Sequence, residues 1–503
     1  MDSVVNTTYG PLRGSADENV HRFLGVPYGA PTSGANRLHP PQPVQPWSGI
    51  RDATEYGEAP FQLAPPESAG TEWDTALAGA DCLNLNVWTP DPGGAGRPVM
   101  VWIQGGAFEF GSTAAYNGRN FARDGIVCVV INWRVGAEGF LDLGDGQANV
   151  GLLDQIAALE WVRGNIAAFG GDPGNVTVFG ESAGAMSIGV LLSMPRAEGL
   201  FRRAVLQSGA AHHALSSETA QRIGGFLAEK LGVPPTREAM AAVPVQQFLA
   251  AQAELKAELS ARPEPERWGH EVLASRMLWQ PTIDGVTVPQ RPIQRIASGA
   301  GSLVDIIVGS NTEDWRLFLA ITGVIGKVTE EDLAESRSVD GFPPIGAYGL
   351  PAEVALREYR SHYPDSSPGD VLAAVETDWW VRIPAIRLAD AHATAASATS
   401  ARTYMYEFAW PAPGLGAVHS MEIPFVFDAL DRNSRLFGPL LGTDPPQELA
   451  DAMHAAWVSF AASGDPGWPG YDPEHRNTMH FNTEARVVPD PRAWERQLWN
   501  GVR

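Results

Sequence analysis

The chain has 503 residues, of which 44% are hydrophobic and 19% charged, so it is expected to be globular with a large buried core. Its formal net charge is −22 and no basic run interrupts it, which argues against nucleic acid or an anionic membrane surface as a partner. No apolar run approaches the ~18 residues that a membrane-spanning helix needs.

The first part of the chain reads as strands followed by a helix. Residues 1–60 alternate short apolar pieces with turn residues. Residues 81–88 alternate in polarity with period two, as a strand does, while residues 97–103 and 126–131 are continuous apolar runs typical of central strands. The apolar spacing of residues 152–169 predicts a helix that ends at the following Gly-Gly-Asp-Pro.

The second part of the chain is richer in helices. Residues 215–275 contain amphipathic patterns that predict helices over 219–231 and 245–260, and residues 328–395 are again mainly helical. Further strands are predicted over 204–208, 304–309 and 402–408, with a closing helix over 446–462. The alternation predicts an α/β fold with a mostly parallel sheet. We expect one catalytic domain over residues 1–503, with the segments around 215–275 and 328–395 as a helical cover.

The pattern Gly180-Glu181-Ser182-Ala183-Gly184 lies between a predicted strand at 175–179 and a predicted helix at 183–194. Strand, Gly-x-Ser-x-Gly and helix together predict a nucleophile elbow, a sharp turn that lifts the serine hydroxyl above the sheet. The flanking glycines remove side chains that would collide with the strand or the helix. Ser182 is therefore the predicted nucleophile.

A second glycine-rich turn follows the predicted strand at 97–103. Backbone N–H groups can approach a substrate closely where glycines lack side chains, so this turn is a candidate oxyanion hole. We expect its donors to be the N–H groups of Gly106 and Ala107, completed by that of Ala183 at the start of the helix after Ser182.

A serine hydroxyl needs a base, and the base needs an acid that fixes its tautomer. His419 is the strongest candidate base, because it lies in a loop after the last strong strand. His212 and His213 follow the strand after the elbow, and His454 lies within a predicted helix. Glu313 and Asp314 both follow the strand ending at Gly309, where an α/β sheet presents functional groups, so either is a candidate acid.

Cysteine usage and the first residues favour a cytoplasmic protein. Cys82 and Cys128 are the two cysteines of the chain, and residues 1–6 lack the basic and apolar regions of a signal peptide. The sequence has no His-Glu-x-x-His, cysteine cluster or phosphate loop, so no metal or organic cofactor is expected. We expect a monomer or a weak homo-oligomer that acts on a small molecule.

Several stretches together resemble the bacterial type-B carboxylesterases, the family that contains the para-nitrobenzyl esterases and is related to the cholinesterases. The matching stretches cover nearly the whole chain and are residues 23–28, 81–90, 132–136, 149–155, 179–185 and 419–425. The resemblance implies an α/β-hydrolase fold and a serine esterase that needs no cofactor.

Residue by residue, the resemblance implies Ser182 as nucleophile, His419 as base and oxyanion donors at Gly106, Ala107 and Ala183. The family's acid stands five residues after a glycine that ends a strand, which is Asp314 here. Three positions depart from the family pattern. The acid is an aspartate instead of a glutamate, Gln104 replaces the usual histidine or tyrosine, and Cys82 lacks the partner of a disulfide found in secreted relatives.

The function expected is hydrolysis of small to medium alkyl or aryl carboxylic esters through an acyl-enzyme. A carbamate or aryl amide hydrolase would use the same residues, and a non-catalytic binding protein is a further alternative. Phe108, Trp315 and Phe318 are the predicted substrate-pocket residues. They belong to a larger set of aromatic residues near the catalytic loops or in the cover that also includes Trp102, Phe110, Trp379 and Trp380.

Overall fold

A computed structural model describes residues 2–63 and 78–502. Its main sheet has thirteen strands in the described part of the chain, twelve of them in the order β1-β2-β3-β5-β7-β6-β8-β9-β12-β13-β14-β15, with β4 beside β2. The strands are β1 (Asp2–Asn6), β2 (Pro11–Asp17), β3 (Val20–Pro27), β4 (Arg51–Asp52), β5 (Asn84–Thr89), β6 (Arg97–Ile103), β7 (Val127–Ile131), β8 (Gly171–Glu181), β9 (Arg203–Gln207), β12 (Asp305–Asn311), β13 (Thr403–Phe408), β14 (Asn477–Phe481) and β15 (Arg486–Pro489). A separate pair consists of β10 (Leu215–Ser216) and β11 (Thr282–Ile283).

The centre of this sheet is parallel and its margins are antiparallel. Neighbouring strands from β7 through β6, β8, β9, β12 and β13 to β14 run parallel. The pairs β1–β2, β2–β3, β3–β5, β5–β7 and β14–β15 run antiparallel. The α/β fold and its mostly parallel central sheet are therefore confirmed.

Helices cover both faces of the sheet and one of its ends. They are α1 (Arg119–Arg123), α2 (Gly136–Phe140), α3 (Val150–Asn165), α4 (Ala183–Leu191), α5 (Ser217–Leu231), α6 (Arg237–Ala241), α7 (Val245–Ala261), α8 (Pro265–Trp268), α9 (His270–Ser275), α10 (Pro292–Ala297), α11 (Arg316–Ile321), α12 (Glu330–Ala334), α13 (Ala352–His362), α14 (Pro368–Thr377), α15 (Ile383–Ala396), α16 (Ile423–Val426), α17 (Gly438–Leu441), α18 (Gln447–Ser463) and α19 (Ala493–Leu498). A π-helical turn, Asp378–Arg382, joins α14 to α15. Within the described residues no helix is long and apolar enough to cross a lipid bilayer.

The two faces of the sheet carry two separate hydrophobic cores. Val99 and Val101 of β6 point into one core, whereas Met100 and Trp102 between them point into the other. This alternation follows from the period of two in a strand, and both sets are fully buried. Burial on both faces explains why the central strands are continuous apolar runs in the sequence. Each fully buried valine or methionine contributes about 1.5–3 kcal/mol relative to exposure.

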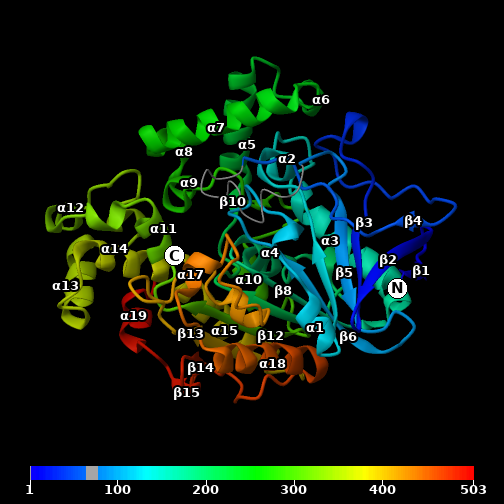
Figure 1. Ribbon diagram of the computed structural model, residues 1–503. Coiled ribbons are helices and arrows are strands. Elements are labelled where there is room, and N and C mark those ends of the chain that lie inside the picture. The colour runs from blue at the N-terminus through cyan, green and yellow to red at the C-terminus, as the bar shows by residue number, and fades with distance from the viewer. Residues whose placement is uncertain (1, 64–77, 503) are drawn as a thin grey trace.

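The two predicted helical segments lie in different places around the main sheet. Helices α6, α7 and α8 lie at the top of the view in Figure 1, beyond α2 and β10, while α12, α13 and α14 lie at its left. Helix α15, at the end of the predicted segment 328–395, instead packs against β12 and β13 of the main sheet. Its buried face, which includes Leu388 and Ala389, belongs to the sheet's core.

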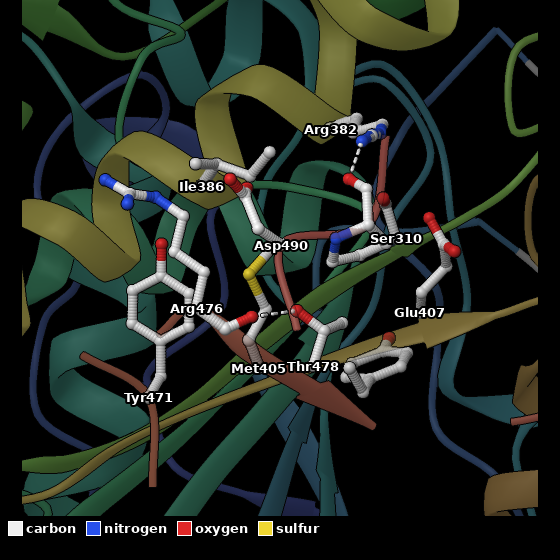
Figure 2. Close-up of a pocket in the computed structure, with 11 residues that line it drawn as sticks. Ser310, Arg382, Ile386, Met405, Glu407, Tyr471, Arg476, Thr478 and Asp490 are labelled. Atoms are coloured by element: carbon white, nitrogen blue, oxygen red, sulfur yellow. Dashed lines mark hydrogen bonds between the residues drawn. The ribbon is translucent and has the colours of Figure 1, made fainter. Parts of the chain in front are cut away.

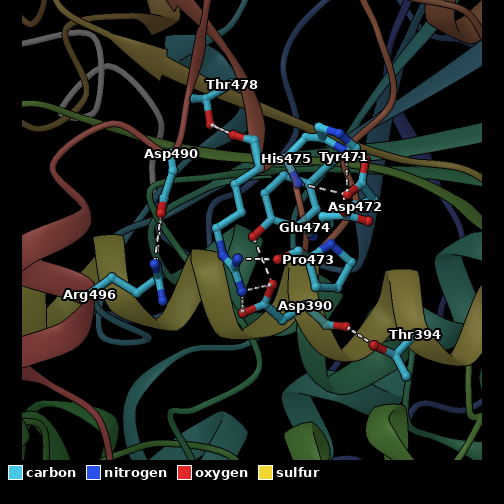
Figure 3. Close-up of polar contacts among 11 residues, drawn as sticks. Asp390, Thr394, Tyr471, Asp472, Pro473, Glu474, His475, Thr478, Asp490 and Arg496 are labelled. Atoms are coloured by element: carbon cyan, nitrogen blue, oxygen red, sulfur yellow. Dashed lines mark hydrogen bonds and ion pairs between the residues drawn. The ribbon is translucent and has the colours of Figure 1, made fainter.

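The C-terminal segment is fastened to α15 by polar contacts (Figure 3). Asp390 accepts a hydrogen bond of 2.8 Å from the Tyr471 hydroxyl and pairs with Arg476 at 3.3 Å. Arg496 of α19 pairs with Asp490 at 2.7 Å. These contacts hold β14, β15 and α19, none of which the sequence analysis predicts, at the edge of the sheet.

A buried ion pair links the loop after β7 to α3. Arg134 donates to both carboxylate oxygens of Asp154, from Nε at 2.8 Å and from Nη2 at 2.7 Å, and donates from Nη1 to the His39 carbonyl at 2.7 Å. The side chains are only 2% and 0% exposed. Such a pair matters mainly because removing one partner leaves the other charge buried and uncompensated.

We expect Asp154→Asn to lower the free energy of unfolding by about 3–5 kcal/mol, because it leaves the charge of the Arg134 guanidinium buried and uncompensated. Asp52→Asn, which breaks the exposed Arg13–Asp52 pair, is the matched control and should cost about 0–1 kcal/mol. Thermal and urea unfolding of both variants measures the difference, and equal losses would contradict the role given to the buried pair.

Candidate active site

Ser182 occupies the predicted elbow between β8 and α4. Its backbone has φ 55° and ψ −125°, a conformation that residues other than glycine rarely adopt. A Cβ on Gly184 would lie 1.9 Å from the Ile103 carbonyl oxygen, and one on Gly180 would lie 2.5 Å from the same atom. Both positions therefore require glycine. The strained turn leaves Ser182 9% exposed at the carboxyl end of β8, next to the N-terminus of α4.

The glycine turn after β6 lies directly beside Ser182. A Cβ built on Gly105 would be 3.1 Å from the Ser182 Cβ. Gly106 has φ 113°, and a Cβ there would collide with the Phe110 carbonyl oxygen at 2.0 Å. Ala107 follows with φ 53°. Hydrogen bonds within the described residues use neither the Gly106 nor the Ala107 N–H, so both donors are available to a ligand.

The Ala183 N–H is also available to a ligand, but for a different reason. Ala183 is the first residue of α4, where a backbone N–H has no partner one turn earlier in the helix. The three N–H groups predicted as oxyanion donors thus come from one turn and one helix start on either side of Ser182.

The loop before α16 brings His419 to the predicted acid. His419 Nδ1 lies 2.5 Å from Asp314 Oδ1, and the His419 N–H donates to the Asp314 carbonyl at 2.9 Å. The other carboxylate oxygen accepts from the Ser208 hydroxyl at 2.6 Å and from the Asn311 N–H at 2.9 Å. Asp314 is completely buried, so its position and the Nδ1–H tautomer of His419 are fixed by these bonds.

Glu313, the other candidate acid, points elsewhere. Its carboxylate accepts from the Ala417 N–H at 2.9 Å and from the Thr312 hydroxyl at 2.5 Å, and its side chain is exposed. The structure therefore brings Asp314, and not Glu313, to His419.

Two further carboxyl groups surround His419, and the sequence analysis misses both. Glu181 Oε1 lies 3.0 Å from His419 Nε2 and accepts from the Ser420 hydroxyl at 2.9 Å. Glu422 accepts from Asn311 Nδ2 at 2.7 Å and from Gln207 Nε2 at 3.2 Å. Glu181 is adjacent to Ser182 in the sequence, and Glu422 lies three residues after His419. An acidic residue close to the predicted nucleophile or base is therefore the sequence signal that could have predicted these two carboxyl groups.

His419 and the carboxyl groups around it together retain a proton at neutral pH. Burial by itself lowers the pKa of His419, but the negative charges of Glu181 and Asp314 outweigh it and raise that pKa to about 9. Burial raises the pKa of Glu181 to about 8 and also raises that of Glu422. Because Glu181 and His419 interact directly, the proton belongs to the pair, and its loss in weakly alkaline solution leaves the imidazole neutral and basic.

The predicted pocket residues divide into two groups. Trp315 and Phe318 are half-buried, with ring centroids 5.7 and 5.2 Å from that of His419. Trp315 also stacks on Trp380 at 4.1 Å. Phe108 differs from the expectation, because its ring is fully buried in the core against Phe140, where it cannot face a substrate.

Other residues considered in the sequence analysis pack in a hydrophobic core or make contacts within the fold. Trp102 packs in the second core against Phe179, away from the elbow. His213 stacks on Trp380 at 4.8 Å, and His454 donates from Nδ1 to the Val426 carbonyl at 2.8 Å. Cys82 and Cys128 are both free and buried, as predicted for Cys82, and burial raises the pKa of Cys82 to about 12.

Gln104 lies beneath the glycine turn. Its side chain is fully buried, and a Cβ on Gly111 would lie 2.9 Å from its Nε2. Gln62 holds Gly111 from the other side, donating to its carbonyl at 3.0 Å and accepting from its N–H at 2.8 Å. Gln62 thus fixes the end of the turn that carries the predicted oxyanion donors, whereas the side-chain amide of Gln104 makes no hydrogen bond within the described residues.

A small pocket under the C-terminal segment is separate from this constellation (Figure 2). Arg382, Glu407, Arg476 and Asp490 are among its lining residues. Arg492 pairs with Glu407, and Arg382 pairs with Glu495 at 2.9 Å. These charges compensate one another and fasten α19 to the π-helical turn.

Comparisons with known proteins identify the family of the chain. The model of the carboxylesterase family matches residues 1–499. The chain belongs to the carboxylesterase family. It is therefore a carboxylic ester hydrolase of the α/β-hydrolase fold, and the family resemblance inferred from the sequence is confirmed.

Its relatives within the carboxylesterase family match over nearly the whole chain. The para-nitrobenzyl esterase of Bacillus subtilis (strain 168) is 34% identical, covering 98% of both chains. The phenmedipham hydrolase of Pseudarthrobacter oxydans is 35% identical, covering 96% of both. Among solved structures, a carboxylesterase of Geobacillus stearothermophilus is 36% identical and superimposes with a TM-score of 0.84 over 99% of each chain.

The contrasting positions of Asp314 and Glu313 give a first test of this site. We expect Asp314→Asn to lower kcat by roughly 10⁴-fold, because an amide no longer fixes the tautomer of His419 or stabilises its cation. Glu313→Gln keeps an acceptor for Ala417 on an exposed side chain and should change kcat less than about threefold. Steady-state kinetics on one p-nitrophenyl ester compares them, and a larger loss in the Glu313 variant would reassign the acid.

The pH profile tests the contact between Glu181 and His419. Glu181→Gln removes a negative charge that favours the protonated imidazole, so the pKa of His419 falls and the acid limb of kcat/KM moves by about 1–3 pH units toward lower pH. Wild type should gain activity as the pH rises toward 8–9, the range of the two raised pKa values. The exposed Glu484→Gln controls for overall charge, and a limb that stays in place in Glu181→Gln would refute the assignment.

Proposed function

We propose that Ser182, His419 and Asp314 form the catalytic triad of a serine carboxylesterase that works through an acyl-enzyme. The observation that carries the proposal is the buried contact of 2.5 Å between Asp314 and His419, at the edge of the sheet where β8 presents Ser182. Family membership supports the reaction class.

In the first half of the reaction, His419 Nε2 takes the proton of the Ser182 hydroxyl while Oγ attacks the ester carbonyl carbon. The tetrahedral oxyanion receives hydrogen bonds from the N–H groups of Gly106, Ala107 and Ala183. Collapse of this intermediate breaks the bond to the alcohol, which leaves with the proton from His419. Asp314 stabilises the transient imidazolium throughout.

In the second half, water attacks the acyl-enzyme. His419 takes a proton from that water, and the second oxyanion occupies the same three donors. Collapse now breaks the bond to Ser182 Oγ, which recovers its proton from His419 and releases the carboxylic acid. The chain's own residues supply every proton transfer in the cycle, so the proposal includes no metal or organic cofactor.

The substrates proposed are small to medium alkyl or aryl esters. Trp315 and Phe318 give the His419 side of the site an apolar, aromatic surface, and the stack of Trp315 on Trp380 makes that surface rigid. Hydrolysis of a carbamate or an aryl amide is the second candidate. It is supported by the similarity to a relative named as a phenmedipham hydrolase.

The proposal also covers the setting of the enzyme. The free, buried state of Cys82 and Cys128 supports a reducing, cytoplasmic environment. The continuous family match supports one catalytic domain over residues 1–503 that acts on a small-molecule ester. The proposal takes the chain to act as a monomer or weak homo-oligomer.

Replacing Ser182 tests the proposal most simply. Ser182→Ala should lower the turnover of p-nitrophenyl acetate, butyrate and octanoate by roughly 10⁵–10⁶-fold, since it removes the nucleophile. Ser298→Ala, at an exposed serine of the same chain, is the matched control and should behave as wild type.

Circular dichroism and thermal unfolding show whether the variant is folded. Retention of more than a few per cent of activity by a folded Ser182→Ala protein would disprove the assignment. The same assay with a matched phenyl ester, anilide and phenyl carbamate distinguishes the two candidate substrate classes.

A further inference from the structure

Ser420, the residue after His419, has a backbone conformation that favours glycine. Its φ is 63°, in the left-handed region where a Cβ lies close to the following carbonyl oxygen. The turn is fixed on one side by the His419 N–H, which donates to the Asp314 carbonyl at 2.9 Å. On the other side, the Ile423 N–H at the start of α16 donates to the Ser420 carbonyl at 3.3 Å. Glycine would make the same turn with less strain, so the turn alone does not explain a serine at this position.

The Ser420 hydroxyl contacts a buried carboxyl group of the site. Its Oγ donates to Glu181 Oε1 at 2.9 Å, and His419 Nε2 lies 3.0 Å from the same oxygen. The Glu181 side chain is only 4% exposed, and its other oxygen lies against Gly105 of the glycine turn, 3.0 Å from a Cβ built there. Within the described residues, Ser420 and His419 are thus the two side-chain partners of Oε1.

The two partners of Oε1 differ in when they can donate. A protonated His419 donates from Nε2 to Glu181. A neutral His419 that keeps its Nδ1 proton on Asp314 has a lone pair at Nε2, and this lone pair must accept the Ser182 proton. In that state the Ser420 hydroxyl is the remaining donor to Oε1. A buried carboxylate that loses its donors binds a proton more readily.

The other charges around Glu181 increase its need for a donor. Burial raises the pKa of Glu181, and the hydrogen bond from Ser420 opposes that rise. The titratable groups that interact electrostatically with Glu181 from the neighbouring elements are His419, Asp314, Glu422 and Tyr406. Of these, only the imidazole can carry a positive charge. Once it is neutral, the acidic neighbours favour a protonated Glu181, and the serine hydroxyl is the side chain that acts against them.

We propose that Ser420 is a positioning residue for the esterase reaction, whose hydroxyl holds Glu181 as a carboxylate when His419 is neutral and so frees Nε2 to take the Ser182 proton. The inference rests on the proposed serine esterase function and adds a residue that acts through Glu181. Without this hydroxyl, Glu181 keeps a proton up to a higher pH and donates it to Nε2, which then cannot act as the base.

Three substitutions of Ser420 separate its hydroxyl from its backbone strain. Ser420→Gly removes both, Ser420→Ala removes the hydroxyl alone, and Ser420→Thr keeps the hydroxyl but adds a branched Cβ that the left-handed region tolerates poorly. We expect the glycine and alanine variants to move the acid limb of kcat/KM by about 0.5–1 pH unit toward higher pH, while the threonine variant keeps the wild-type limb. Thermal unfolding should rank them differently, with Tm raised in Ser420→Gly and lowered in Ser420→Thr.

A second strained serine provides the matched control. Ser336 has φ 53° and lies after α12, where its hydroxyl accepts from the Gly346 N–H at 3.0 Å. Ser336→Gly relieves the same kind of strain, so it should raise Tm and leave the acid limb at the wild-type pH.

The kcat/KM of one p-nitrophenyl ester, measured from about pH 5 to 10 with the Ser182→Ala background subtracted, gives the position of the limb. In a Glu181→Gln background, Ser420→Gly should cause no further shift, because the amide has no charge to stabilise. A shift of full size in that background would overturn the action through Glu181.

Two further results would overturn the role of the hydroxyl. One is a limb that stays at the wild-type pH in both Ser420→Gly and Ser420→Ala. The other is a limb that follows Tm across the three Ser420 variants, as a purely structural role requires. Absence of Ser182-dependent hydrolysis in the wild type would instead refute the proposed function.

Discussion

The backbone of Ser182 is held at φ 55° and ψ −125° because β8 must pass into α4 within one residue. This is possible only where Gly180 and Gly184 let the turn approach the Ile103 carbonyl closely. The same approach brings the end of β6, and so the glycine turn, beside Ser182. The position of the nucleophile and that of the oxyanion donors are therefore two consequences of one close packing. The backbone conformation of Ser182 costs about 1–3 kcal/mol, and the packing of the surrounding buried strands maintains it.

The electrostatics of the site depend on a second constraint, the burial of three carboxyl groups around one imidazole. Asp314 is satisfied by Ser208 and Asn311, so it remains a fixed partner for Nδ1. Glu181 faces Nε2, the nitrogen that must receive the serine proton. This contact makes the site retain a proton until weakly alkaline pH. It also links the elbow to the histidine loop, because Ser420 donates to the same carboxylate oxygen.

Much of this framework could be predicted from the sequence, where one local property decides the structure. The central strands are recognisable because both of their faces are buried, as at β6 and β7. The elbow is recognisable because Gly180, Ser182 and Gly184 form a Gly-x-Ser-x-Gly pattern between a predicted strand and a predicted helix. The choice of Asp314 over Glu313 needed the family pattern, since both follow the same strand.

What escaped prediction depends on contacts between distant parts of the chain. Glu181 and Ser420 are 239 residues apart, so their meeting leaves no local pattern. The marginal strands β2 and β14 carry arginine, glycine or histidine among few apolar residues, and pairing with a neighbour stabilises them. Phe108 follows a turn with positive φ at Ala107, which directs its ring into the core instead of the pocket.

The central claim is that Ser182 is the single activated nucleophile of this chain. Reaction of the protein with a p-nitrophenyl alkylphosphonate, followed by intact-mass measurement and peptide mapping, tests it most directly. The account predicts one phosphonyl group per chain, on the peptide that contains Ser182, with activity lost in proportion to labelling. Loss of all activity with the label on another residue, or full activity after complete labelling of Ser182, would contradict it.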